Sequence, residues 1–201
     1  INLLRGIYSY GFETPSTIQK KAIKPLLSGR DVIAQAQSGT GKTGAFTIGT
    51  LGQINIRENS TQAIILSPTR ELSKQIYNVL KDISHMMTGI RISLLVGGTV
   101  IDEDIVGLKN SPHIVVGCPG RVNDMIRRRK LQTKKVKITV LDEADEMLSK
   151  GFKEQIYSIF HCLDEKTVQI ALFSATLSND LMVLSQKLLR NPEKILVKAE
   201  A

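Results

Sequence analysis

Aromatic residues are scarce in this chain of 201 residues, which has four Tyr, five Phe and no Trp. Proteins that hold single-stranded nucleic acid without sequence preference commonly stack bases on aromatic side chains. So few aromatics disfavour a stacking platform. If nucleic acid binds here, we expect contacts to phosphate and sugar to dominate.

Long apolar runs are also missing. No apolar segment approaches the ~18 residues expected of a membrane-spanning helix, so no membrane span or membrane partner is expected. The opening residues INLLRGIYSY lack both a basic n-region and an apolar h-region, so no signal peptide is expected. Because the chain starts at Ile1 and not at Met, we expect a fragment of a longer protein.

Cysteine and histidine show no metal-binding pattern. Cys118 and Cys162 are too far apart for a ligand motif, and His85, His113 and His161 have no partner at ligand or triad spacing. Both cysteines are predicted to be reduced and structural. An intracellular protein, of the cytoplasm or nucleus, is therefore expected.

The overall composition is that of an ordinary globular domain, with 42% hydrophobic and 23% charged residues. The length and the lack of repeats or linkers predict a single domain over residues 1–201. The net charge of +8 favours a polyanionic partner, although it says nothing about the fold.

Short runs rich in Val, Ile and Leu alternate with amphipathic segments. Strands are predicted at 32–34, 63–67, 91–96, 113–117, 137–141, 168–173 and 194–197. Helices are predicted at 3–10, 17–27, 44–54, 70–86, 102–109, 121–129, 153–163 and 180–189. Pro25 is expected to kink the second helix or to end it early. The alternation predicts an α/β fold with a mostly parallel sheet and helices on both faces.

Unusual short motifs follow the strands. In open α/β sheets, ligands bind at the carboxyl ends of the strands, so these motifs are expected to line one edge of the sheet. The motifs are the loop 36–43, PTREL at 68–72, Gly97-Gly98, CPGR at 118–121, DEAD at 142–145 and SAT at 174–176.

Residues 31–43, DVIAQAQSGTGKT, predict a phosphate-binding loop between a buried strand and a helix. Glycines let successive backbone N–H groups converge on one anion, and the helix N-terminus adds the positive end of its dipole. Lys42 is expected to bind the β- and γ-phosphates, and the Thr43 hydroxyl to ligate Mg²⁺. A glycine- and serine-rich surface loop is the alternative. The predicted nucleotide-binding residues here are Ala36, Gln37, Ser38, Gly39, Thr40, Gly41, Lys42 and Thr43.

Asp142 and Glu143 follow an apolar strand directly. Asp142 is placed to hold Mg²⁺, partly through water, opposite Thr43, and Glu143 to orient or deprotonate the attacking water. Lys42, Asp142 and Glu143 are thus the predicted catalytic residues. The alternative is that both acids cap the short helix that follows.

Asp145, Ser174 and Thr176 are predicted to couple this site to a partner surface. Asp145 either bridges to the turn at 174–176 or pairs locally, and Ser-Ala-Thr alone is also a common helix cap. Glu146 is expected to pair with Lys150 at i,i+4.

Arg70 and Arg121 each open a helix directly after a strand, a placement suited to phosphate binding. Two anion sites beyond the phosphate loop suggest a polynucleotide backbone. The alternative is two surface arginines paired with Glu71 or Asp124. The basic run 127–130 is equally compatible with a solvated helix end.

Together these motifs resemble the first RecA-like domain of DEAD-box RNA helicases, over essentially the whole chain. The resemblance rests on GFETPSTIQ (11–19), AQSGTGKT (36–43) and the five later motifs, in the family's order. The family's loop begins with Ala, as at Ala36. YGFETPSTIQKKAI and GRVNDMI look most like the branch of translation initiation factor 4A and its splicing-linked relatives.

The resemblance implies ATP and Mg²⁺ as cofactors. Phe12 would stack on adenine and Gln19 would bind its edge, within an adenine-reading segment at 11–19; without the family both would be interpreted as helix-packing residues. RNA would be bound through phosphates and 2′-hydroxyls, without reading of its sequence. Cys118 departs from the family's usual Thr, which leaves that one RNA contact open. The implied RNA-binding residues are Pro68, Thr69, Arg70, Gly98, Pro119, Gly120, Arg121 and Asp124.

The family's second RecA-like domain, which carries the arginine fingers, is absent from this chain. Such fingers contribute on the order of 10³–10⁵ in rate. We therefore expect a monomeric domain that binds nucleotide weakly, hydrolyses it very slowly and unwinds nothing alone.

The expected function is that of an ATP-dependent RNA helicase in translation initiation, with RNA, the second domain and a helical-repeat scaffold protein as partners. An alternative is an ATP-gated RNA clamp of a splicing-linked complex that does not unwind. A third is a P-loop switch or metabolic kinase unrelated to RNA, which predicts no adenine reader at Gln19.

Overall fold

The computed structural model describes residues 2–12 and 14–197. Its strands are β1 (Val32–Gln35), β2 (Ala63–Leu66), β3 (Ile92–Leu95), β4 (Ile114–Gly117), β5 (Ile138–Asp142), β6 (Gln169–Ser174) and β7 (Glu193–Leu196). They form one sheet in the order β3-β4-β2-β5-β6-β1-β7, and each neighbouring pair is parallel. The predicted α/β fold with a parallel sheet is confirmed.

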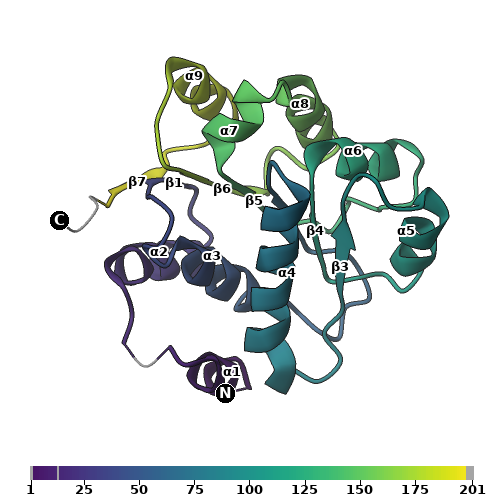
Figure 1. Ribbon diagram of the computed structural model, residues 1–201, viewed down its shortest axis with the longest axis horizontal. Helices are drawn as coiled ribbons and strands as arrows, with labels where there is room; N and C mark the ends of the chain where they lie inside the picture. Colours follow the sequence, from purple (N-terminus) through teal and green to yellow (C-terminus); the bar gives the residue numbers. More distant parts are fainter. Residues whose placement is uncertain (1, 13, 198–201) are drawn as a thin grey trace.

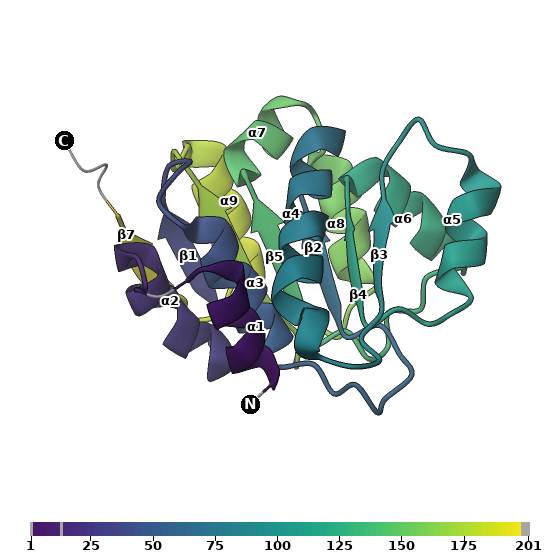
Figure 2. The same ribbon diagram turned by 60° about the horizontal axis from the view of Figure 1, so that its bottom comes forward.

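Helices cover both faces of this sheet (Figures 1 and 2). On one face lie α1 (Asn2–Tyr10), α2 (Thr17–Leu27), α3 (Lys42–Leu51) and α4 (Arg70–Ile83), with the 3₁₀ turn η1 (Ser84–Met86). On the other lie α5 (Ile101–Leu108), α6 (Pro119–Arg127), α7 (Ala144–Ser149), α8 (Lys153–His161) and α9 (Asn179–Leu188). Among the described residues, no helix combines the length and the apolar character needed to cross a membrane.

The central strands are largely apolar because both of their faces are buried. In β2, Ile64 and Leu66 belong to the core under α5 to α9, while Ala63 and Ile65 belong to the core under α2 to α4. All four side chains are inaccessible to solvent. This double burial explains why continuous apolar runs predicted the strands better than alternation did.

Helix boundaries differ from the predictions by a few residues. The third helix begins at Lys42 and not at 44, and α6 begins at Pro119 and not at 121, since proline is well suited to the first helical position. The segment predicted as one helix over 70–86 ends as α-helix at Ile83 and finishes in the 3₁₀ turn.

Pro25 does not end α2 early, because the helix continues to Leu27. Proline removes only one backbone donor, and here it stands in the last turn of the helix. At the other end, Ser16 caps α2 in a reciprocal pair with Gln19.

Candidate functional site

Strand order brings the motifs to one edge of the sheet in two groups. The strands β1, β6 and β5 are neighbours, so the phosphate loop, the 174–176 turn and the 142–145 motif lie side by side. The strands β2, β4 and β3 form the second group, which carries the motifs at 68–72, 118–121 and 97–98. Pairing of β2 with β5 joins the two groups into one continuous edge.

The phosphate loop presents exposed main chain between β1 and α3. Ala36 is buried, and its N–H donates to the Ser174 carbonyl at 2.9 Å, which ties the loop to β6. Gly39 and Gly41 have φ of 81° and 88°, in the left-handed region that favours glycine. Lys42 follows directly as the first residue of α3.

The side chain of Lys42 ends between the two predicted acidic residues. Its Nζ lies 3.1 Å from Asp142 Oδ1 and also contacts Glu143 Oε1. The side chains of Lys42, Asp142 and Glu143 are 6%, 0% and 18% exposed. The sequence thus correctly grouped three residues that lie about a hundred positions apart.

The alternative that Asp142 and Glu143 merely cap α7 is not supported by the geometry. Glu143 does occupy the N-cap position, with a left-handed φ of 53°, but its side chain makes no capping hydrogen bond. Asp142 Oδ1 instead accepts from the Glu143 N–H at 3.0 Å, and the Glu143 carboxylate turns to Lys42. The strained turn therefore aims both carboxylates at the phosphate-loop lysine.

Burial perturbs the charges of this cluster. Desolvation raises the pKa of Asp142 to about 6, and the neighbouring Lys42 only partly offsets that rise. Burial alone would lower the pKa of Lys42, but Asp142 and Glu143 together raise it above its ordinary value. Lys42 consequently stays charged at neutral pH, whereas Asp142 takes up a proton when the pH falls just below neutral.

The residues present fit a magnesium ion held together with a nucleotide. Asp142 Oδ2 is buried and has no hydrogen-bond partner, so one carboxylate oxygen is left for a cation or its water. In the described part of the chain, no three His, Cys, Asp or Glu residues gather to hold a metal unaided. This donor set suits Mg²⁺, which usually takes one or two carboxylates, substrate phosphates and waters.

A pocket of about 950 Å³ opens between the phosphate loop, the start of α2 and the end of β7. The exposed loop residues Gln37, Ser38 and Gly39 form one wall, and Lys20 and Lys21 of α2 contribute positive charge to another. A nucleotide on the loop would thus find both backbone donors and lysines around it.

Gln19 and Phe12 lie against the first turn of α3. Gln19 is 4% exposed; its Oε1 accepts from the Ser16 N–H and its Nε2 donates to the Gly41 carbonyl at 3.2 Å. A Cβ added at Gly44 would stand 2.7 Å from Gln19 Nε2 and 3.0 Å from Phe12 Cζ. The two residues therefore pack on the phosphate loop, with the orientation of the Gln19 amide fixed by the cap of α2.

Asp145 connects the 142–145 motif to the turn after β6, as one of its two predicted arrangements requires. Its backbone N–H donates to Ser174 Oγ at 3.1 Å, and its carboxylate accepts from the Thr176 hydroxyl. The carboxylate also accepts from the Ser178 N–H and from Ser178 Oγ. The local pair of Glu146 with Lys150 is present as well, at 3.6 Å.

In the second group of motifs, Thr69 caps α4 and Arg70 is exposed. The Thr69 side chain accepts from the Leu72 N–H at 3.1 Å. The guanidinium of Arg70 lies over Gly98, where an added Cβ would stand 2.7 Å from Nη1. Gly98 has φ of 84°, so both its backbone and its neighbour favour glycine. Pro68 is buried beside Thr69, while Gly98 is exposed.

Cys118 lies half-buried just before Pro119, with its Sγ 3.7 Å from Ser73 Oγ. Burial raises the pKa of this thiol, which argues for the inert, structural role predicted for it. His113 is likewise structural, since its buried ring accepts from the Arg91 N–H and donates to the Ile56 carbonyl.

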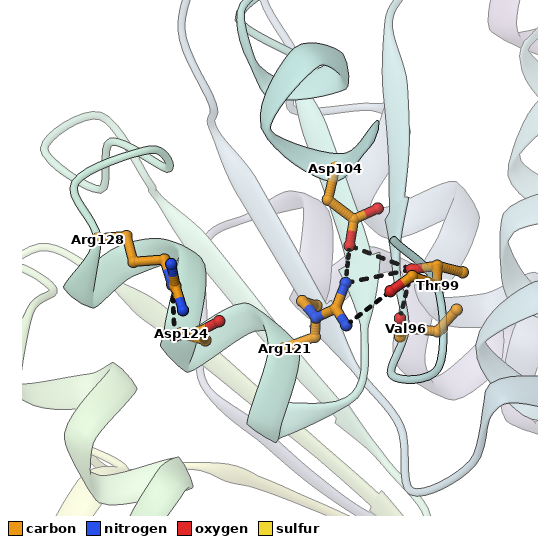
Figure 3. Close-up of polar contacts among 6 residues, drawn as sticks. All are labelled: Val96, Thr99, Asp104, Arg121, Asp124 and Arg128. Carbon is orange, nitrogen blue, oxygen red and sulfur yellow. Dashed lines mark hydrogen bonds and ion pairs between the residues drawn. The ribbon is translucent and has the colours of Figure 1, made fainter. Parts of the chain in front are cut away.

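Arg121 does not pair with Asp124 as the alternative supposed (Figure 3). Its Nη1 lies 2.5 Å from Asp104 Oδ2, and Asp124 pairs with Arg128 at 2.9 Å. The prediction missed Asp104 and Thr99. The only signal available was a run of acids opening α5, which is ordinary at a helix N-terminus.

Comparison with known proteins points to one family. A family model described as DEAD/DEAH box helicase matches residues 16–184. The ATP-dependent RNA helicase eIF4A of Lodderomyces elongisporus is 54% identical over 199 residues, covering 99% of this chain and 50% of the relative. The eIF4A of Candida albicans shows the same identity and coverage.

Solved structures share the fold. A DEAD box protein from Methanococcus jannaschii is 38% identical with a TM-score of 0.93, over 98% of this chain and 53% of that one. Dbp5 of S. cerevisiae, bound to RNA and ADP BeF3, is 38% identical with a TM-score of 0.87, over 98% and 50% of the two chains. The chain spans about half the length of the curated relatives it matches.

Proposed function

The chain belongs to the DEAD/DEAH box helicase family, as its motifs predicted, and we propose that it is the ATP- and RNA-binding half of an ATP-dependent RNA helicase. The observation that carries this proposal is the cluster of Lys42, Asp142 and Glu143 beside an exposed phosphate loop. A buried lysine held by two carboxylates is poised to exchange one of them for phosphate oxygens.

In this proposal the chain's own residues bind and orient MgATP. In the loop 36–43, backbone N–H groups from Gln37 to Thr43 at the start of α3 hold the phosphates, and Lys42 moves from Glu143 to the β- and γ-phosphates. Glu143, once released, orients or deprotonates the attacking water. Magnesium, with Thr43 and Asp142 nearby, would neutralise charge on the phosphates. Phe12 and Gln19 select adenine.

RNA lies along the second group of motifs. The exposed Arg70, the Gly98 turn and the first turn of α6 face the same edge of the sheet, which supports contacts to successive phosphates. Asp145, Ser174 and Thr176 couple the nucleotide site to a partner surface; within the chain, the carboxylate and N–H of Asp145 join the end of β5 to the turn after β6. The remaining proposed contacts are Pro68, Thr69, Pro119, Gly120 and Asp124.

Hydrolysis and duplex remodelling require a second RecA-like domain with arginine fingers. Without it the chain binds nucleotide weakly and hydrolyses it slower by on the order of 10³–10⁵. The eIF4A relatives favour a role in translation initiation over the non-unwinding splicing clamp. The proposal also includes an intracellular location and a helical-repeat scaffold protein as partner.

Calorimetric titration of the chain with Mg-ADP and Mg-GDP tests the nucleotide proposal. We expect ADP to bind and GDP not to bind, Lys42→Ala to lose ADP, and Gln19→Ala to lose the preference for adenine. Arg30→Gln, which removes one charge at the opposite edge of the sheet, is the matched control and should bind ADP as the unchanged chain does. Equal binding of ADP and GDP would refute adenine reading, and a folded chain that binds neither would refute the nucleotide site.

A further inference from the structure

We propose that Arg121 positions the RNA-binding surface and does not itself bind an RNA phosphate. Its guanidinium holds the turn at 96–99 against the start of α6 and forms an ion pair with Asp104, an arrangement that we call the clamp. The inference rests on the proposed function, because it concerns which groups of that edge meet RNA. It replaces the expectation, drawn from the family resemblance, that Arg121 is a phosphate ligand.

The clamp joins three elements through one guanidinium (Figure 3). Nη1 of Arg121 donates to Asp104 Oδ2 at 2.5 Å and to Thr99 Oγ1 at 3.2 Å, and Nη2 donates to the Thr99 carbonyl at 3.2 Å. The Thr99 hydroxyl in turn lies 3.0 Å from the Val96 carbonyl. The end of β3, the first turn of α5 and the first turn of α6 are thereby held together.

Burial makes this clamp costly to open. The side chains of Arg121 and Asp104 are each 10% exposed, whereas the neighbouring pair of Arg128 with Asp124 is 50% and 38% exposed. If an RNA phosphate bound Arg121 in place of Asp104, then Asp104 would remain as a largely buried carboxylate without its cation. Removing one partner of a buried pair is much more damaging than breaking a surface pair.

Other groups at this edge remain open to RNA. Arg70 is exposed, and it forms no ion pair within the described ranges 2–12 and 14–197. Gly120 is exposed, with open space where a side chain would stand, so backbone N–H groups at the start of α6 are accessible. The clamp fixes Gly98, on which Arg70 rests, relative to that helix start.

The test is RNA binding by the chain, measured by fluorescence anisotropy with a labelled single-stranded oligouridine over a series of salt concentrations. Each phosphate contact contributes about 0.7 to the slope of log affinity against log salt for a single strand. We expect Arg70→Gln to lower that slope by about 0.7. Arg121→Gln and Asp104→Asn should each weaken binding about fivefold to tenfold at an unchanged slope, with no further loss in the double variant.

Two milder variants keep the test decisive if a charge deletion unfolds the chain. Arg121→Lys keeps the positive charge but loses the planar guanidinium that donates to Asp104 and Thr99 together, so it should weaken RNA binding as Arg121→Gln does. Thr99→Val removes only the hydroxyl and should weaken binding by a smaller factor at the same slope. Arg30→Gln, on the far edge, is the control for net charge. Circular dichroism establishes that each variant is folded.

Two results separate the inference from the proposed function. If Asp104→Asn strengthens RNA binding, or Arg121→Lys binds normally while Arg121→Gln lowers the slope, then Arg121 is a phosphate ligand that Asp104 masks, and only the inference fails. If the unchanged, folded chain binds no RNA at any salt concentration, the proposed RNA site fails, and the inference fails with it.

Discussion

Replacing Asp142 with Asn is expected to make the protein more stable at neutral pH. Asp142 is fully buried, and burial raises its pKa from 3.8 to about 6. Between those two values the folded protein binds the proton more tightly than the unfolded chain does. The free energy of unfolding therefore falls as pH rises from about 4 to about 6, and Asp142 lowers stability above that range.

The magnitude follows from the two pKa values. Each pH unit between them is worth about 1.4 kcal/mol, so ionised Asp142 costs about 3 kcal/mol at pH 7 and above. Asn carries no charge and removes this cost. The measured gain should be smaller than about 3 kcal/mol, since Lys42 keeps only Glu143 as its partner in the variant.

Urea unfolding from pH 4.5 to 8 measures the effect, as the difference between the two proteins at each pH. That difference cancels the contribution of the buried His113, whose lowered pKa makes stability fall as pH drops. Asp164→Asn, at an exposed carboxylate, is the control and should show little difference at any pH. The reasoning is refuted if the free energy of unfolding varies with pH in the same way in both proteins, or if Asp142→Asn is the less stable protein at pH 7.5.

Three further changes test the packing around the site. Gly44→Ala should weaken Mg-ADP binding about tenfold in calorimetry, because the new methyl displaces Gln19 and Phe12, whereas Gly107→Ala meets open space and should have no effect. Asp145→Ala should lower the free energy of unfolding by about 1–3 kcal/mol in urea, since Ser178 and Thr176 lose their acceptor; an unchanged denaturation midpoint would contradict this. Ser16→Ala should cost about 1 kcal/mol through the lost cap of α2, while Ser9→Ala, on an exposed face of α1, should cost much less in the same assay.

The local sequence pattern was sufficient to predict the helices, the strands and the phosphate loop. Strands such as 63–66 were predictable because a strand buried on both faces must be apolar along its length. The phosphate loop was recognisable because binding a phosphate needs left-handed backbone, convergent N–H groups and a cation at fixed positions. Gly39, Gly41 and Lys42 supply them. Strand ends that share one edge then predicted that Lys42, Asp142 and Glu143 would lie in one site.

Pairings between distant side chains were not predictable in the same way. The acid nearest to Arg121 in the sequence is Asp124, yet the ion-pair partner of Arg121 in the structure is Asp104. That choice depends on how α5 and α6 pack on neighbouring strands, which no local periodicity encodes. The joint use of Gln19 in a helix cap and against Gly41 has the same origin.

The sequence by itself determined the alternation of strands and helices, the phosphate loop and the motifs of the family, since backbone preference and burial act over a few neighbouring residues. Only the tertiary structure decided the strand order that places β1 beside β6 and β2 beside β5, and with it the partners of each buried charge. A buried charge must find a counter-charge wherever packing leaves one within reach, and packing is settled by the whole chain at once.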